Sequence, residues 1–158
     1  QGRSITSSSD GTKLAVVGQN RNIYTSIDSG VTWTSRDSSR AWLSITSSSD
    51  GSRLAAGVDS GYIYTSSDSG VTWTQRATSG KWTAITSSSD GIKLAAAVSP
   101  GYIYNSSDSG VTWTQSTTIG YAYWNSVASS SDGSKLLAAG DSTAIYIGSA
   151  GSKTRSSN

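Results

Sequence analysis

Serine and aspartate are the side chains through which this chain of 158 residues could do chemistry. The sequence holds 37 Ser, 18 Thr and 10 Asp, but it has no His, Cys, Glu, Met or Phe. A nucleophilic Ser needs a base, and the sequence contains neither an imidazole nor a Ser-x-x-Lys arrangement. Without Cys and His there are no thiolate or imidazole metal ligands and no disulfides. We therefore expect no catalytic residue, no metal site and no cofactor.

The ten Asp residues leave carboxylate chemistry to consider. Four of them recur in the motif Ser-Ser-Ser-Asp-Gly, spaced by 40, 40 and 42 residues, at Asp10, Asp50, Asp90 and Asp132. Glycoside hydrolysis uses two carboxylates in unequal environments, whereas a repeated structure gives its carboxylates equivalent ones. A glycosidase is therefore the least expected function. The Ser-Asp-Gly runs are instead typical of tight turns.

The repeats organise the whole chain. Residues 41–80 and 81–120 are identical at 28 of 40 positions without a gap, which implies recent duplication or deliberate engineering. We expect a single repeat domain over residues 1–158. Its four units are expected at about 1–40, 41–80, 81–122 and 123–158.

Each unit is expected to form four short strands. In the second unit, Trp42–Ser47 and Arg53–Val58 flank an Asp-Gly turn, which is a hairpin signal. Tyr62–Thr65 and Val71–Thr74 follow after two further turns, and no helical periodicity is present. A four-stranded antiparallel sheet repeated every 40 to 45 residues is typical of a propeller blade. The sequence therefore predicts an all-β fold, a β-propeller with four blades per chain.

A second repeated motif carries a family resemblance. Ser-x-Asp-Ser-Gly-Val-Thr-Trp occurs at residues 26–33, 66–73 and 106–113. It resembles the Asp-box, or BNR repeat, of sialidases, sortilin-type receptors, some glycoside hydrolases and photosystem II assembly factors, all of them β-propellers. The resemblance covers essentially the whole chain and implies the fold, but one fold hosts many activities. Sialidase chemistry, as that family implies, also needs a Glu, which this chain lacks.

We expect the Asp-box-like residues to act structurally. The Asp carboxylate can accept backbone N–H groups of a tight hairpin, the Gly supplies a positive φ and the Trp packs over the turn. One carboxylate per box is far from the six to eight oxygens that Ca²⁺ takes. The residues in this structural role are expected to be Ser26, Asp28, Gly30, Trp33, Ser66, Asp68, Gly70, Trp73, Ser106, Asp108, Gly110 and Trp113.

The first and last units depart from the repeat. Gly2 stands where the other units place Trp42, Trp82 and Trp124, and Ala150 stands where the box would have its Asp. If the blades have the curvature of an eight-bladed ring, one chain is a half ring with two exposed apolar flanks. We therefore predict a homodimer in which the fourth unit of each copy meets the first unit of the other. The alternatives are a compact four-blade ring and a piece of a longer protein.

The loops that vary between units are where we expect a ligand, because variable loops on a repeated scaffold carry function. A scaffold or binding module is the leading interpretation. Its main alternative is a carbohydrate-binding lectin, since aromatic faces beside polar groups suit sugar stacking. The competing interpretation of the three unit-starting Trp residues is that they fill the space between blades. The candidate ligand-binding residues are Trp42, Trp82, Trp124, Tyr62, Tyr102, Arg40, Lys81 and Asp59.

The net charge and the hydropathy of the chain exclude two classes of partner, nucleic acids and membranes. A net charge of +2 with dispersed basic residues predicts no nucleic-acid partner. No amphipathic helix or polybasic tail predicts membrane binding, and no apolar run approaches the roughly 20 residues of a membrane span. We therefore expect a soluble chain whose partners are itself and a glycan or protein ligand. Its compartment stays open, with secretion or the cell surface included if a signal peptide was removed.

Overall fold

The computed structural model describes residues 2–141, 145–149 and 152–156, and these residues form strands, turns and loops with no helix. The all-β fold predicted from the sequence is thereby confirmed. The strands are β1 (Gly2–Ser7), β2 (Leu14–Ser26), β3 (Thr34–Ser47), β4 (Leu54–Val58), β5 (Gly61–Ser66), β6 (Thr74–Gly80), β7 (Trp82–Ser87), β8 (Leu94–Val98), β9 (Ile103–Ser106), β10 (Thr114–Gln115), β11 (Trp124–Ser129), β12 (Lys135–Gly140), β13 (Ile145–Ser149) and β14 (Ser152–Ser156).

The strands form four antiparallel blades. β7–β10 make the third blade and β11–β14 the fourth, each with four strands hydrogen-bonded in sequence order. β1–β6 form one continuous sheet because β3 runs through two blades: Thr34–Ala41 pairs with β2, whereas Trp42–Ser47 pairs with β4. The first blade therefore comprises β1, β2 and the start of β3, and the second comprises the end of β3 with β4–β6.

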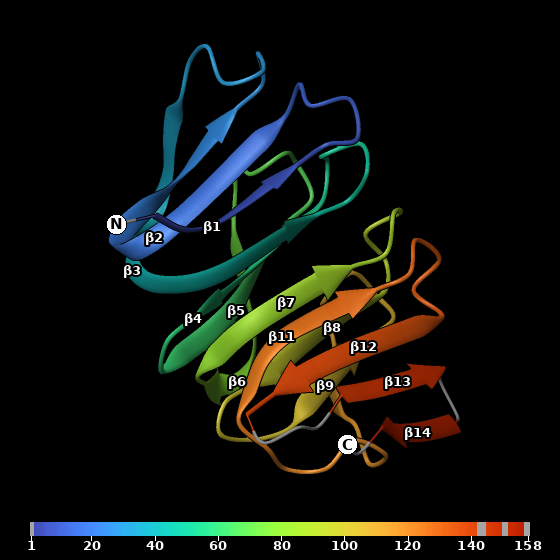
Figure 1. The fold of residues 1–158 in the computed structure, drawn as a ribbon. Helices are drawn as coiled ribbons and strands as arrows, with labels where there is room; N and C mark the ends of the chain where they lie inside the picture. Colours follow the sequence, from blue (N-terminus) through green and yellow to red (C-terminus); the bar gives the residue numbers. More distant parts are fainter. Residues whose placement is uncertain (1, 142–144, 150–151, 157–158) are drawn as a thin grey trace.

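The blades lie side by side in an open arc (Figure 1). The innermost strands β1, the end of β3, β7 and β11 contact one another in turn. The first blade and the fourth lie at opposite ends of this arc (Figure 1). The described residues thus form part of a propeller and not a compact four-blade ring.

The core lies between the blades and depends on aromatic rings. Trp42, at the start of the inner strand of the second blade, packs in one buried cluster with Ala15, Val17 and Ile23 of the first blade. Its ring meets the Tyr64 ring edge-on at a centroid distance of 5.3 Å. Equivalent clusters surround Trp82 and Trp124 at the next two junctions. Large rings supply the buried apolar area that a chain poor in aliphatic residues otherwise lacks.

The described part of the chain contains no helix with the length and apolarity needed to cross a membrane.

Candidate functional site

The three Asp-box-like turns, residues 26–33, 66–73 and 106–113, hold their polar groups in internal hydrogen bonds. In the first of these box turns, the Ser26 hydroxyl donates to Asp28 Oδ1 at 2.7 Å and accepts the Gly30 N–H at 2.9 Å. Asp28 also accepts the N–H and hydroxyl of Thr32 at 2.9 and 2.6 Å. Trp33 Nε1 donates to the Gly30 carbonyl at 3.0 Å. The other two turns repeat these bonds.

These hydrogen bonds keep the box carboxylates ionised. The Thr32 hydroxyl and N–H lower the pKa of Asp28 to about 2, and Thr112 does the same for Asp108. Burial raises the pKa of Asp68, but the bonds from Thr72 outweigh it and bring the value to about 2. A general acid near neutral pH needs a raised pKa, so these carboxyl groups are unsuited to that role.

The Ser-Ser-Ser-Asp-Gly segments form a second set of self-contained turns, which we call triple-serine turns (residues 7–11, 47–51, 87–91 and 129–133). The Ser8 hydroxyl donates to Asp10 at 2.6 Å and accepts the Lys13 N–H at 3.0 Å. The Ser8 hydroxyl and the Thr12 N–H lower the pKa of Asp10 to about 2. The equivalent hydroxyls donate to their own Asp in the other three turns. The serine therefore lies beside an ionised acid with which it is already paired.

Both sets of turns lie at one end of the blades. The Ser29 N–H in the first box turn donates to the Thr12 carbonyl just after the first triple-serine turn, at 2.9 Å, and the next two blades repeat this bond. We call this end the turn face. Within the residues that the structure describes, no group of three or more acidic side chains could hold a metal ion. Two hollows between neighbouring blades open here and have equivalent linings, one with Lys13 and one with Arg53.

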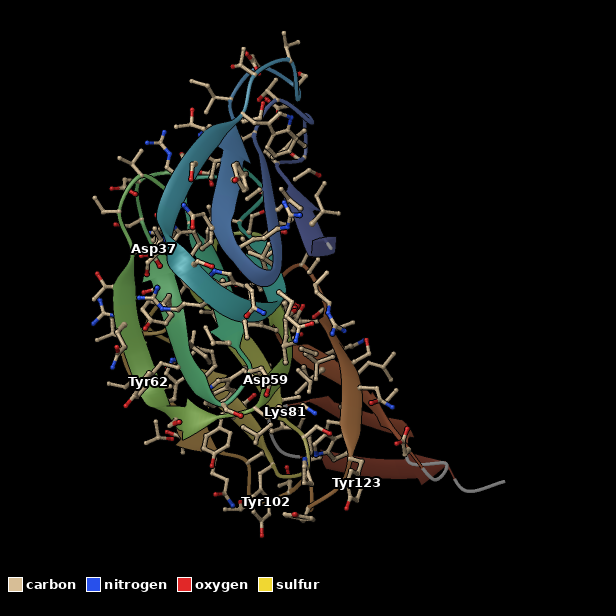
Figure 2. The ribbon with its side chains drawn as sticks, turned by 90° about the vertical axis from the view of Figure 1, so that its left-hand side faces the viewer. Asp37, Asp59, Tyr62, Lys81, Tyr102 and Tyr123 are labelled. Atoms are coloured by element: carbon tan, nitrogen blue, oxygen red, sulfur yellow. The ribbon has the colours of Figure 1, made fainter. Side chains whose placement is uncertain are left out.

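The opposite end, which we call the loop face, carries four of the eight predicted ligand-binding residues. Figure 2 shows Asp59, Tyr62, Lys81, Tyr102 and Tyr123 on this side of the molecule. Tyr62 and Lys81 are exposed, whereas Asp59 and Tyr102 are half-buried. Asp59 and Tyr102 come from the loops that join the second and third strands of blades two and three, and Tyr62 lies near the start of β5. Lys81 and Tyr123 come from the connections between blades. The structure therefore brings these predicted residues to one face.

Two exposed tyrosines extend this face beyond the predicted residues. Tyr121 and Tyr123, in the connection before β11, are 60% and 57% exposed. The Tyr121 ring meets the Tyr102 ring edge-on at 5.4 Å. Both tyrosines lie where the third unit meets the fourth, and the third unit is two residues longer than the first two. That extra length, with two aromatic residues in a connecting loop, was the available sequence signal.

Arg40 is engaged elsewhere. Its guanidinium lies 4.3 Å from the centre of the Tyr64 ring and 5.5 Å from the centre of the Trp42 ring. It also forms an ion pair with Asp37 at 3.3 Å. Figure 2 shows Asp37 apart from the labelled tyrosines. Arg40 therefore stabilises the junction of the first two blades and lies outside the tyrosine-rich part of the loop face.

The three unit-starting tryptophans are fully buried at the blade junctions. Trp82 Nε1 donates to the carbonyls of Gly61 and Thr78 at 3.2 and 3.3 Å, and Trp124 Nε1 donates to the Gly101 carbonyl at 3.1 Å. A ring enclosed in this way has no free face against which a sugar or peptide could stack. Their burial supports the space-filling interpretation of Trp42, Trp82 and Trp124 over the ligand-binding one.

Comparisons with solved structures support a propeller. A YCF48 structure bound to a D1 peptide matches with a TM-score of 0.73 and 19% identity, covering 98% of this chain and 53% of that one. YCF48 from Cyanidioschyzon merolae matches with a TM-score of 0.74 and 18% identity, covering 99% and 56%. The GH74 enzyme of Niastella koreensis matches with a TM-score of 0.74 and 21% identity, covering 97% and 24%.

These likenesses establish the fold, because YCF48 and GH74 enzymes are both β-propellers. The chain spans about half the length of the two YCF48 chains and about a quarter of the GH74 chain. No model of a known family matches the sequence, and neither does any curated protein.

Proposed function

We propose that this chain is a non-catalytic β-propeller module that binds a protein ligand, as an exposed peptide segment, on its loop face and that completes its ring by self-association. The observation that carries the binding role is that the loop face exposes three tyrosines, Tyr62, Tyr121 and Tyr123, and also Lys81. These four residues, together with Tyr102 and Asp59, form what we call the tyrosine patch.

The chemistry of the tyrosine patch suits peptide recognition. Tyr combines a large apolar ring with a hydroxyl, loses little conformational entropy on binding and is enriched at the centres of protein interfaces. Lys81 and Asp59 add one charge of each sign, which can orient a peptide through its own side chains and backbone. The similar YCF48 structure has a D1 peptide bound, which supports peptide binding by a propeller of this architecture.

The described acidic side chains support a non-catalytic role. Seven of the ten Asp residues have lowered pKa values because they accept hydrogen bonds within their own turns. The likeness to GH74 enzymes rests on 21% identity and reflects the shared fold. A general acid for glycoside hydrolysis needs a raised pKa, whereas these seven carboxyl groups are shifted in the opposite direction.

A carbohydrate ligand is the second candidate, and one observation favours it. Tyr102 and Tyr121 form an edge-to-face pair at 5.4 Å, and the Tyr121 ring is largely exposed. An exposed ring held by a neighbour offers a flat apolar face against which a sugar can stack. The half-buried Asp59 would supply a hydrogen-bond acceptor for sugar hydroxyls.

One experiment compares these ligands directly. Fluorescently labelled protein is applied to a random peptide array and to a glycan array, with the Tyr121→Ala/Tyr123→Ala double variant alongside. Val111→Ser is the matched control because Val111 is an exposed apolar residue of a box turn. We expect peptide binding that the double variant weakens at least about 30-fold, the loss typical of removing interface hot spots, and that the control retains. Glycan binding with the same pattern would establish the lectin instead, and no patch-dependent binding to either array would refute the binding role.

A further inference from the structure

The same backbone hydrogen bond occurs at each of the three junctions between blades. The backbone N–H of the third serine in a triple-serine turn donates to the carbonyl of the equivalent serine in the next blade. The bonds run from Ser9 to Ser49, from Ser49 to Ser89 and from Ser89 to Ser131, each at 2.7 Å. Every internal junction therefore has a donor serine on one blade and an acceptor serine on the next.

A basic side chain repeats at each junction as well. Arg53 of the second blade lies over Gly91 of the third, where an added Cβ would come within 2.8 Å of the Arg53 Cβ. The Arg53 guanidinium then donates to the Asp90 carbonyl at 2.7 Å. Lys13 covers Gly51, and Lys93 covers Gly133, in the same way. The glycine of the triple-serine turn in blades two, three and four thus makes room for the stem of a basic residue from the preceding blade.

The two ends of the arc show the unfilled halves of one more such junction. Among the described residues, the N–H groups of Ser9, Ser49 and Ser89 donate to the next blade, but the equivalent N–H of Ser131 has no such bond. Likewise, the Ser9 carbonyl accepts no bond of this kind. Gly11 has no atom within 4 Å of the place its Cβ would occupy, although the three equivalent glycines are covered. Lys135 is the equivalent of the covering basic residues, but it is not among the side chains that lie against a glycine of another blade within the described residues.

Apolar side chains at the two ends of the arc are exposed, although their equivalents at the internal junctions are buried. Ile5 on the first blade is 64% exposed, whereas the equivalent Ile45 and Ile85 are 5% and 6% exposed. Leu137 on the fourth blade is 42% exposed, whereas the equivalent Ala15 and Ala55 are each 1% exposed. Ile45 shares a buried cluster with Ala15, and Ile85 shares one with Ala55. Ile5 and Leu137 are therefore at the positions that pack against each other across an internal junction, but here each lacks its partner blade.

The sequence changes at the two ends compensate each other in size. At the first two internal junctions a Trp shares a buried cluster with a small Ala from the preceding blade, Trp42 with Ala15 and Trp82 with Ala55. At the free ends the sizes are reversed, because Gly2 replaces the Trp and Leu137 replaces the Ala. A core that loses a large residue on one side can keep its packing if the facing side gains volume. This exchange fits a junction between the two ends of the same sequence.

We propose that a second copy of this chain fills both open halves, so that two arcs close into one ring of eight blades. This inference rests on the self-association part of the proposed function and names its contacts. Ser131 N–H of one copy donates to the carbonyl of the partner's Ser9, Lys135 covers the partner's Gly11, and Leu137 packs against the partner's Ile5. The interface continues an arrangement that each copy already makes three times. Each arc covers about half of a longer YCF48 propeller chain, so two arcs supply a ring's worth of blades.

Sedimentation equilibrium of the full chain tests the ring. We expect a particle of twice the 16.3 kDa chain mass. Ile5→Lys alone and Leu137→Asp alone should each shift the mass to that of the monomer with unchanged circular dichroism. The combined variant should recover the dimer, because the new charges face each other. Ile27→Ser is the control, since Ile27 is exposed in a box turn and its equivalents Ser67 and Ser107 are serines.

Cross-linking tests the register of the junction, since the chain has no Cys. Oxidised Ser9→Cys/Ser131→Cys should give a covalent dimer on a non-reducing gel. The internal control, Ser49→Cys/Ser89→Cys, should cross-link within one chain at the equivalent distance. A monomer mass for the unmodified chain at all concentrations, or a control that cross-links while the end pair does not, would overturn the proposal. Peptide binding by the monomeric Ile5→Lys variant would show that the binding role survives failure of the ring.

Discussion

The indole N–H groups of the three equivalent tryptophans differ in their hydrogen bonds. A residue that differs between units can therefore change the hydrogen bonding of a repeated core. Trp82 Nε1 has two carbonyl partners, whereas buried Trp42 Nε1 has none among the described residues. The carbonyl equivalent to that of Thr78 belongs to Ser38, which instead accepts a hydrogen bond from Arg40. An unpaired buried donor is costly, so the first junction is weaker in this respect than the second.

We predict that Trp82→Phe destabilises the protein more than Trp42→Phe. Both changes remove similar ring volume, but only the first breaks hydrogen bonds and leaves carbonyl groups unpaired. The difference in the free energy of unfolding should be about 1 kcal/mol or more. Urea denaturation of the two variants measures it. Equal losses, or a larger loss for Trp42→Phe, would contradict the hydrogen-bond account.

Ser66 carries a second prediction at the residue scale. Its hydroxyl is buried and links Asp68 to the Gly70 N–H at 2.7 and 2.9 Å. Ser66→Ala leaves a buried N–H without its acceptor, which costs about 1–3 kcal/mol. The neighbouring Ser67 is exposed, so Ser67→Ala should be nearly neutral and serves as the control. Thermal melting distinguishes the two, and a neutral Ser66→Ala would show that the box turn does not depend on this bond.

At the scale of elements, the triple-serine turns are equivalent in backbone but not in surroundings. Gly11 and Gly91 both have a φ of +72°, a conformation that favours glycine. The Cβ position of Gly91 is closed by Arg53 from the preceding blade, whereas that of Gly11 is open. The same turn therefore tolerates different changes depending on whether a blade precedes it.

This difference gives a prediction that also reports on ring closure. Gly11→Ala in dilute monomer should cost only the backbone strain of a positive φ, about 1 kcal/mol. Gly91→Ala should cost about 1–3 kcal/mol more because of the contact with Arg53. At concentrations where the proposed dimer forms, Gly11→Ala should also weaken association. Urea unfolding at low and high protein concentration measures both effects, and a Gly11→Ala cost independent of concentration would argue against the ring.

The elements were more predictable from the sequence than the candidate site. Asp-Gly and Asp-Ser-Gly turns recur with a fixed period, so strands and hairpins follow from local chemistry. Two features did not follow from the local pattern. β3 continues from one blade into the next, which depends on contacts between units that a pattern within one unit does not contain. The predicted strand Val71–Thr74 is wrong, because Thr72 and Trp73 are held in the box turn by hydrogen bonds and β6 begins only at Thr74. Tyr121 and Tyr123 lie in the connection that is two residues longer than those of the first two units, and although Tyr123 is the equivalent of the exposed Lys81, their residue type differs from the other units.

At the scale of the whole molecule, the paired carboxylates are spread over all four blades. Asp10 and Asp28 of the first blade each have a pKa near 2, well below the ordinary value of 3.8. The pKa of Asp132 in the fourth blade is shifted in the same direction, mainly by the Ser130 hydroxyl. A lowered pKa in the folded state contributes stability that is complete above 3.8 and is lost as the pH falls towards 2. Acid therefore weakens every blade over the same pH range.

We predict that the melting temperature is nearly constant between pH 5 and pH 7 and falls steeply below about pH 4. The chain has no His and no Glu, so no side chain titrates with an ordinary pKa in the plateau. Thermal melting followed by circular dichroism from pH 2 to pH 7 measures the profile. Asp28→Asn should reduce the drop between pH 4 and pH 2, and a decline that begins near pH 6 would require another titrating group.

The serine hydrogen bonds that link the blades give the arc a polarity. Each bond points from a donor in one blade to an acceptor in the next, so among the described residues the first blade ends in an unused carbonyl and the fourth in an unused N–H. Two identical ends cannot pair, since they would set donor against donor or acceptor against acceptor. Association through these ends is therefore restricted to closed rings or, where a variant alters the curvature, to open fibres. Mutations that change the angle between blades thus carry a specific risk, which is polymerisation.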